Sequence, residues 1–291
     1  FTASALLASA RASNKFLGAK AGQQWSLFLP LTHIAAVNVI IRSMELGTLP
    51  IDLREHQGEY PKVDFTSIVP TQLFRALNSD ERLLRHLQSA QAVLVGGAAL
   101  SPALSQQAVT AGINVVETYG MTETSGGCIY NGKAIEGVEY SLNDKSLVQI
   151  RGSVMSETYL NAPELYTLID GWFITNDLGE IKDGKLHILG RADDVIISGG
   201  ENLSLTAIEA TLSIRYPEIE FAAFAVNDIQ WGHALHLAVV GQIGESEIDQ
   251  YLEAALGAAS KPKGIHHLEQ LPLLGIGKVD RSALAKMVGN E

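Results

Sequence analysis

Four short segments of the sequence combine glycine with hydroxyl, carboxylate or basic side chains at spacings that suit phosphate chemistry. The first is Glu117-Thr118-Tyr119-Gly120-Met121-Thr122-Glu123-Thr124, where an apolar run leads into a glycine and then into polar groups. In open α/β sheets, ligands bind beyond the carboxyl ends of the strands. A threonine there can hydrogen-bond a phosphate, and a glutamate can hold Mg²⁺ through its oxygen atoms. Taken alone, the segment also fits a polar turn that caps the next helix.

The second and third segments add an acidic group after an apolar run and a basic residue beside an acidic pair. Residues 171–177 end in Asp177, whose carboxylate could accept hydrogen bonds from both hydroxyls of a ribose. An aspartate in a turn is the simpler interpretation of that segment alone. Residues 189–202 contain Arg191 and a short apolar run before Gly199-Gly200, a pair that permits close backbone approach to a ligand. The alternative there is an interdomain linker followed by a hairpin.

The fourth segment, residues 271–281, carries Lys278 on a glycine-flanked loop between apolar residues. Such a lysine can reach a phosphoryl or carboxylate oxygen as a mobile point charge. If the segment stood alone, a solvated surface lysine would be the simpler interpretation.

The elements that must position these segments follow an α/β pattern over the first two thirds of the chain. Helical and strand signals alternate there, which is typical of a mostly parallel sheet with helices on its faces. A buried-strand run at residues 92–95 ends at Gly96-Gly97, and a further strand at 113–119 leads into the first segment. The other expected elements are helices at 3–17, 34–46 (closing at Gly47), 70–77 and from Ser101-Pro102, and strands at 25–29 and 67–69.

After about residue 130 short strands and turns dominate, and the last hundred residues have mixed α+β character. Turn signals at residues 143–144, 170–171 and 183–184 predict a small β subdomain at about 131–190. Beyond it we expect a helix with a capping box from Thr206 to Glu209, a strand at 235–240 and a helix capped by Ser246. The predicted fold is therefore a large α/β domain over residues 1–190 and a small α+β domain over 191–291.

Composition excludes several classes of protein. Lys and Arg total 21 against 32 Asp and Glu, a formal net charge of −11, which would repel a nucleic acid. The single cysteine, Cys128, excludes an internal disulfide and the common Cys-rich zinc sites. The best apolar run, residues 34–41, is far shorter than the ~20 residues of a membrane-spanning helix. We therefore expect a cytoplasmic protein without a nucleic-acid or membrane partner.

The order and spacing of the four segments resemble the adenylate-forming superfamily of acyl-CoA synthetases, adenylation domains and firefly-type luciferases. Further matches are residues 29–33 (Leu-Pro-Leu-Thr-His), residues 96–100 (Gly-Gly-Ala-Ala-Leu) and Trp231-Gly232. The resemblance covers essentially the whole chain. Within the superfamily, the compact length and the Gly-Met-Thr-Glu-Thr and Gly-Gly-Glu-Asn variants are most similar to the 2-succinylbenzoate–CoA ligases of menaquinone biosynthesis.

The resemblance implies an acid–thiol ligase that joins a small-molecule carboxylic acid to ATP with Mg²⁺ and then transfers the acyl group to CoA. It implies catalytic roles for Lys278, which would bridge the substrate carboxylate and the α-phosphate, for Thr122 at the phosphate and for His33 as a gate of the acyl pocket. A packed core histidine remains the alternative for His33. Glu123 would hold Mg²⁺. The implied ATP- and AMP-binding residues are Gly96, Gly97, Ala98, Glu117, Thr118, Tyr119 (stacked on adenine), Thr122, Asp177 and Arg191 (both on the ribose).

For the second half-reaction the resemblance implies that the small domain swings about a hinge at Asp193. One orientation would bring Lys278 to ATP, and the other would bring Ser198, Gly199 and Gly200 toward CoA. Three alternatives stay open: an adenylation enzyme for another acid or a carrier protein, a luciferase-like oxygenase, and a fragment that binds nucleotide without turnover. A homo-oligomer also stays open.

The sequence departs from the family pattern in three places. Asn176 stands where many members have Gly, and Leu205 and Ala207 replace a frequent Pro and Glu. The family's Ser/Thr/Gly-rich phosphate loop, which lies upstream of the histidine motif, has no counterpart in the chain, whose first residue is Phe1 rather than Met. We therefore expect the N-terminal part of the large domain to be missing and the β- and γ-phosphates to lose backbone N–H donors.

Overall fold

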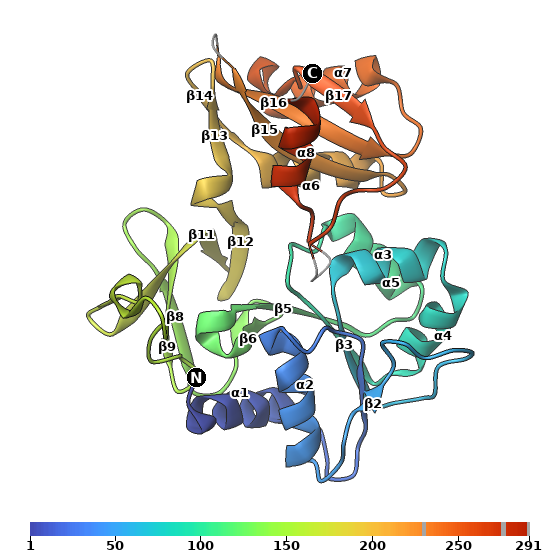
Figure 1. Cartoon of the computed structure of the whole chain (residues 1–291), viewed down its shortest axis with the longest axis vertical. Coiled ribbons are helices and arrows are strands. Elements are labelled where there is room, and N and C mark those ends of the chain that lie inside the picture. The colour runs from blue at the N-terminus through green and yellow to red at the C-terminus, as the bar shows by residue number, and fades with distance from the viewer. Residues whose placement is uncertain (229–230, 275–277, 290–291) are drawn as a thin grey trace. The chain divides into compact units, whose positions relative to one another are not determined.

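The computed structural model describes residues 1–228, 231–274 and 278–289, except for the side chain of Asp193 (Figure 1). The chain divides into two compact units, and each is described by itself below. The first consists of residues 1–100, 105–175 and 179–188, and the second of residues 101–104, 176–178 and 189–291. The domain limits expected from the sequence, 1–190 and 191–291, remain a prediction.

A seven-stranded sheet with the strand order β2-β1-β3-β4-β5-β6-β7 forms the centre of the first unit. The five strands from β2 to β5 are parallel, whereas β6 and β7 are antiparallel additions. Every residue of β3 and β4 is buried, as expected for parallel strands covered on both faces. The strands are β1 (Trp25–Leu27), β2 (Ile51–Asp52), β3 (Phe65–Ile68), β4 (Ala92–Val95), β5 (Val115–Met121), β6 (Gly126–Tyr130) and β7 (Lys133–Ala134).

Five helices accompany this sheet, and α1 and α2 lie side by side (Figure 1). They are α1 (Ala3–Phe16), α2 (Ile34–Glu45), α3 (Pro70–Asn78), α4 (Glu81–Ser89) and α5 (Pro102–Thr110). The core between helices and sheet contains the fully buried rings of Trp25, Phe65 and Tyr130. The α/β class expected from the sequence is confirmed. Helix α4 was not expected from the sequence; it begins after the N-cap Asp80, whose side chain accepts a hydrogen bond from Leu83 N.

A second, five-stranded sheet follows, with the order β10-β11-β9-β8 and with β12 paired to β11. Its strands are β8 (Val138–Leu142), β9 (Leu147–Gly152), β10 (Leu168–Ile169), β11 (Trp172–Lys182) and β12 (Lys185–Arg191), with a short 3-10 helix η2 (Pro163–Leu165) before β10. Asp170 and Gly171 have φ of 51° and 80°, and Asp183 and Gly184 have 52° and 70°. These positive values are those of two-residue hairpin turns, so the turns predicted at 170–171 and 183–184 are confirmed. The turn predicted at 143–144 is confirmed as well, since Ser146 N donates to Asn143 O at 2.9 Å.

The third sheet belongs to the second unit and has the order β14-β13-β16-β15, with β17 paired in parallel to β16. It consists of β13 (Val195–Ser198), β14 (Glu201–Ser204), β15 (Glu220–Asp228), β16 (Gly232–Val240) and β17 (Gly264–His267). Its helices are α6 (Leu205–Arg215), α7 (Glu245–Leu256) and α8 (Arg281–Val288), and α6 and α8 both pack on β15. The remaining 3-10 turns are η1 (Thr122–Thr124), η3 (Ala192–Asp194) and η4 (Ala258–Ser260).

Two expected helix caps are wrong. The N-cap of α6 is Ser204, whose hydroxyl accepts from Ala207 N, and not Thr206. Glu209 cannot complete a capping box because its carboxylate is turned inward to Arg281. Helix α7 begins after Gly244, which places Ser246 inside the first turn. Among the helices of the described residues, none is long and apolar enough to cross a membrane.

Candidate functional site

The first chemical segment is a tight connection between β5 and β6 that requires glycine at its centre. A Cβ on Gly120 would lie 2.2 Å from the carbonyl oxygen of Gly126, so no other residue fits without moving the backbone. The strand register shifts between Tyr119 and Gly120, which marks a β-bulge. Thr124 then fixes the turn, since its hydroxyl accepts from Met121 N at 2.9 Å and lies 2.7 Å from Gly126 O. Thr122 and Glu123 are held at the tip of this connection.

Gly96 and Gly97 follow β4 at the edge of the sheet where β5 presents Thr118. A Cβ on Gly96 would lie 2.2 Å from Thr118 Oγ1, so the close approach of the two segments depends on glycine. Gly97 has a φ of 84°, and the Thr118 hydroxyl donates to Val95 O at 3.3 Å. The structure therefore brings Gly96, Gly97 and Thr118 together at the carboxyl end of the parallel strands. Ala98 continues the same loop.

Glu117 and Tyr119 flank Thr118 on β5. Burial raises the pKa of the Glu117 carboxyl, and the nearby His187 opposes this shift. The Glu117 backbone is fixed by Asn131, whose side-chain oxygen accepts from Glu117 N at 2.9 Å. Tyr119 is half-buried and packs against the core. Both are thus held by the sheet, and their nucleotide roles remain predictions.

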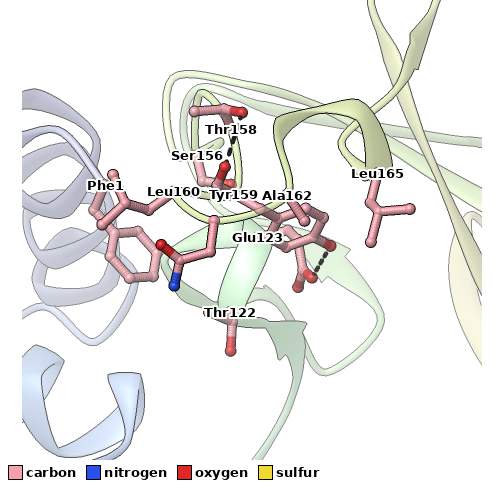
Figure 2. Close-up of a pocket in the computed structure, with 10 residues that line it drawn as sticks. Phe1, Thr122, Glu123, Ser156, Thr158, Tyr159, Leu160, Ala162 and Leu165 are labelled. Carbon is pink, nitrogen blue, oxygen red and sulfur yellow. Dashed lines mark hydrogen bonds between the residues drawn. The ribbon is translucent and has the colours of Figure 1, made fainter.

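Glu123 lines a cavity of about 730 Å³ in the first unit (Figure 2). The Tyr159 hydroxyl donates to Glu123 Oε1, and Ser156 N donates to Glu123 O at 2.7 Å. Burial and the Glu123 carboxylate raise the pKa of Tyr159 to about 12. The cavity is lined by Phe1, Thr122, Glu123, Ser156, Thr158, Tyr159, Leu160, Asn161, Ala162 and Leu165.

The donor set at this cavity fits a magnesium ion carried by a nucleotide. Mg²⁺ is usually bound through one or two carboxylates together with phosphates and water. Glu123 supplies one carboxylate, Thr122 adds a hydroxyl, and the cavity leaves room for phosphates. Within the described part of the chain, no group of three or more His, Cys, Asp or Glu side chains could form a metal site of its own. A metal here would therefore depend on the nucleotide for most of its ligands.

His33 begins α2 as its N-cap residue, with no side-chain capping bond. It is half-buried, and within the described ranges no hydrogen bond joins its ring to another predicted site residue. Another residue of the same helix contacts the β5–β6 connection, since Asn38 Nδ2 donates to Ser125 O. The gating role of His33 remains a prediction.

In the second unit, Asp177, Arg191 and Lys278 form one charged cluster. Arg191 NH1 lies 3.6 Å from Asp177 Oδ1, so the two predicted ribose ligands form an ion pair. Lys278 is electrostatically coupled to both, because burial and Arg191 lower the pKa of Lys278 while Asp177 and Asp194 oppose the shift. Segments about 14 and 100 residues apart in the sequence thus meet here.

Arg281 anchors the segment that carries Lys278. Its NH2 group donates to both carboxylate oxygens of Glu209, at 2.8 and 2.9 Å, and its Nε donates to Ala223 O at 2.9 Å. Its NH1 lies 3.5 Å from Asp194 Oδ2 in η3. Lys278 itself is tied through Leu274 N, which donates to Lys278 O at 2.7 Å. The predicted hinge residue Asp193 lies in η3, and its side chain is outside the described residues.

Gly199 and Gly200 form the turn of the β13–β14 hairpin, with φ of 59° and 87°. The hairpin interpretation of this segment is therefore confirmed. A Cβ on Gly199 would lie 2.7 Å from the Trp231 ring, and Gly199 N donates to Trp231 O at 3.1 Å. The neighbouring Ser198 is buried. The part of these residues in CoA binding remains a prediction.

Arg42 is a buried cation that the sequence analysis did not single out. It is 4% exposed, and its guanidinium donates to the Tyr130 hydroxyl at 3.0 Å and to Ser67 Oγ at 3.4 Å. It also lies 5.1 Å from the centroid of the Trp25 ring. Among the residues that the structure describes, Arg42 has no carboxylate within ion-pair distance, and its Nε has no hydrogen-bond partner. A missing counterion leaves no pattern in a sequence, so only the structure could identify it.

Comparison with known proteins places these features in one family. Residues 1–158 match the family described as AMP-binding enzyme. A probable 2-succinylbenzoate–CoA ligase of Mycobacterium tuberculosis is 35% identical over 100% of this chain and 80% of its own length. A 2-succinylbenzoate–CoA ligase of Listeria monocytogenes is 29% identical over 95% of this chain and 64% of its own length.

Solved structures show the same likeness. MenE of Escherichia coli, bound to an analogue of OSB-AMS, superimposes with a TM-score of 0.73 at 27% identity and covers all of this chain. The o-succinylbenzoate CoA synthetase of Bacillus subtilis, in complex with OSB-AMP, has a TM-score of 0.80 at 24% identity over 97% of the chain. The chain spans 66% and 65% of the lengths of these two proteins.

Proposed function

The chain belongs to the family of AMP-binding enzymes, and from that premise we propose that it acts as a 2-succinylbenzoate–CoA ligase of menaquinone biosynthesis. The observation that carries the proposal is the match along its whole length to a relative of that name at 35% identity. ATP, Mg²⁺ and CoA follow as its co-substrates and metal.

The proposed reaction has two steps. A carboxylate oxygen of the acid attacks the α-phosphorus of ATP, so that an acyl-adenylate forms and pyrophosphate leaves. The thiol of CoA then attacks the acyl carbon, the thioester forms, and AMP leaves with the electron pair of the broken bond. The first step builds negative charge on the transferred phosphate, and a preorganised cation stabilises such a transition state.

We assign these tasks to residues of both units. In the first unit, the nucleotide would approach the backbone at the end of the parallel strands, at Gly96, Gly97 and Thr118. Glu123 would be a ligand of Mg²⁺, which neutralises charge on the phosphates when bound. In the second unit, Asp177 and Arg191 would bind the ribose, and Lys278 would carry positive charge to the α-phosphate. The lowered pKa of Lys278 supports this role, since partial loss of hydration is its largest cause and a less hydrated cation interacts more strongly with a phosphate.

Arg42 is the residue to which we assign the second carboxylate of the substrate. 2-Succinylbenzoate carries one carboxylate that is activated and a second that remains on the ring. A buried guanidinium without a counterion is costly, and a substrate carboxylate could supply the missing charge. The Tyr130 and Ser67 hydroxyls hold the guanidinium on the same sheet that ends in the nucleotide edge. We therefore infer that Arg42 selects for the ring carboxylate.

The test compares CoA thioester formation from 2-succinylbenzoate and from 4-oxo-4-phenylbutanoate, which lacks the ring carboxylate. The enzyme used is the complete gene product that contains residues 1–291. We expect kcat/KM to favour 2-succinylbenzoate by 10-fold or more, because a lost hydrogen-bonded charge pair costs about 1.5–3 kcal/mol. Arg42→Lys keeps the positive charge but loses the forked N–H donors of the guanidinium, so we expect it to reduce the ratio of the two kcat/KM values. Equal kcat/KM values for the two acids would count against the assigned substrate. Formation of the acyl-adenylate without the CoA thioester would favour an enzyme that transfers the acyl group to a carrier protein.

A further inference from the structure

We propose that Tyr159 is a positioning residue for Glu123. Its hydroxyl binds one oxygen of the Glu123 carboxylate, so that the other oxygen faces the cavity as a metal ligand. The inference rests on the proposed function, in which Glu123 meets the Mg²⁺ of the nucleotide. Nothing in the sequence pattern pointed to Tyr159, which lies 36 residues after Glu123.

The two oxygens of the Glu123 carboxylate are in different situations. Oε1 accepts the hydrogen bond from the Tyr159 hydroxyl, as the dashed line in Figure 2 shows. Oε2 has no hydrogen-bond donor, and no Lys, Arg or His pairs with the carboxylate, among the residues that the structure describes. Both Glu123 and Tyr159 line the cavity. One oxygen is therefore fixed by the protein, and the other is left for a ligand.

The tyrosine is itself braced by neighbouring aromatic rings. The Tyr166 ring meets the Tyr159 ring edge-to-face at 5.5 Å and stacks on Phe173 at 5.3 Å. The Tyr166 hydroxyl donates to Ser156 O at 2.5 Å, and Ser156 N in turn donates to Glu123 O. The segment 156–166 thus hydrogen-bonds both the main chain and the side chain of Glu123. A ring held in this way offers its hydroxyl in one place.

The chemistry of the donor explains why a tyrosine suits this position. A phenol donates a hydrogen bond but carries no charge, so it orients the carboxylate without neutralising it. A lysine or arginine at the same distance would compete with the metal for the negative charge. Outer-shell partners of this kind fix the direction of a ligand, and losing them typically lowers metal affinity 10- to 100-fold.

The test measures metal binding rather than turnover, using Mn²⁺ in place of Mg²⁺ with the complete gene product saturated with ATP. Protein-bound Mn²⁺ is followed by the enhancement of water-proton relaxation. Tyr159→Phe keeps the ring and its packing but removes the hydroxyl, and we expect its Mn²⁺ dissociation constant to rise about 10-fold. Tyr140→Phe is the matched control, because within the described part of the chain its hydroxyl donates to the Gly132 and Gly184 carbonyls and not to Glu123. We expect that variant to bind Mn²⁺ as the unmodified protein does.

A double-mutant cycle separates positioning from a general structural effect. If Tyr159 acts through Glu123, then Tyr159→Phe should change Mn²⁺ binding little in a Glu123→Gln background. The inference would be overturned if Tyr159→Phe weakened Mn²⁺ binding equally in both backgrounds. It would also be overturned if the Mn²⁺ dissociation constant of Tyr159→Phe stayed within twofold of that of the unmodified protein, or if Tyr140→Phe weakened Mn²⁺ binding as much as Tyr159→Phe. Failure of the unmodified protein to bind Mn²⁺–ATP would instead overturn the proposed function on which it rests.

Discussion

Lys278 is a cation with charges of both signs around it. Burial and Arg191 lower its pKa, and Asp177 and Asp194 raise it, so its charge depends on the whole cluster. The main chain around it is closed by the bridge between Leu273 and Val279. In the proposed cycle this cation is needed in the adenylation step.

We predict that Lys278→Ala lowers the rate of acyl-adenylate formation by at least 10²-fold, since removing one preorganised donor to developing charge typically costs about 10²–10³ in rate. Thioester formation from a supplied acyl-adenylate should be nearly unchanged. The two half-reactions are measured separately by pyrophosphate release and by consumption of synthetic acyl-adenylate. Similar losses in both would show that Lys278 serves the fold or both steps alike.

At the scale of elements, His86 joins α4 to the central sheet as a buried neutral imidazole. Its Nδ1 lies 2.9 Å from Pro61 O and its Nε2 lies 3.0 Å from Ser26 Oγ. Burial lowers the pKa of His86, and the contact with the Pro61 carbonyl opposes the shift only in part. The unfolded chain, with a histidine pKa of about 6.5, therefore binds a proton more readily than the folded one.

We predict that His86 makes the stability against urea fall as the pH drops below about 6.5, because protons on this residue then favour the unfolded state. The His236 pKa is lowered in the same direction and adds to the effect. His86→Gln should flatten the slope between pH 6.5 and 5.5, although it lowers stability at pH 8. The check is the urea midpoint across this range, and an unchanged slope in His86→Gln would contradict the assignment.

The connection between β12 and β13 is the element on which the second half-reaction depends in the proposed cycle. It contains η3, where Asp194 is tied to Arg281 while Asp193 precedes it. We predict that Asp193→Pro leaves adenylation within about threefold and slows thioester formation by 10-fold or more, because proline fixes φ near −65°. Asp193→Ala, which keeps backbone freedom, is the control. Fast thioester formation by the proline variant would show that the backbone at Asp193 does not have to turn.

The sequence predicted the elements whose signals are local. Periodic apolar runs and glycine stops located β4 and α2, and Asp-Gly pairs located two hairpin turns. Helix α4 was missed although its signals are local, with Asp80 as N-cap and with Leu83 and Leu87 buried at helical spacing. The capping errors arose because Ser204 and Thr206 carry similar hydroxyls, and only the tertiary contact of Glu209 with Arg281 decides between them.

The candidate site divides in the same way. Motif residues such as Thr118, Glu123 and Lys278 could be singled out because glycines, hydroxyls or both lie close to them in the sequence. Tyr159 and Arg42 were not found, since the importance of each depends on contacts distant in sequence. The fixed position of the Tyr159 hydroxyl and the lack of a counterion at Arg42, among the described residues, are properties of the folded chain.

At the scale of the whole molecule, the groups assigned to the reaction are distributed over two units with separate cores. The first unit holds the glycine edge and Glu123, and the second holds the ion pair of Asp177 and Arg191 with Lys278. In the proposed cycle neither unit can form an acyl-adenylate alone. The first step therefore tests the account as a whole.

The most direct measurement is ATP–pyrophosphate exchange by the complete gene product in the absence of CoA. Labelled pyrophosphate enters ATP only if the enzyme forms an acyl-adenylate reversibly. The account predicts Mg²⁺-dependent exchange that requires 2-succinylbenzoate, falls at least 10²-fold in Lys278→Ala, and is followed by thioester formation once CoA is added. Absence of exchange with 2-succinylbenzoate, or exchange that does not depend on the acid, would contradict it.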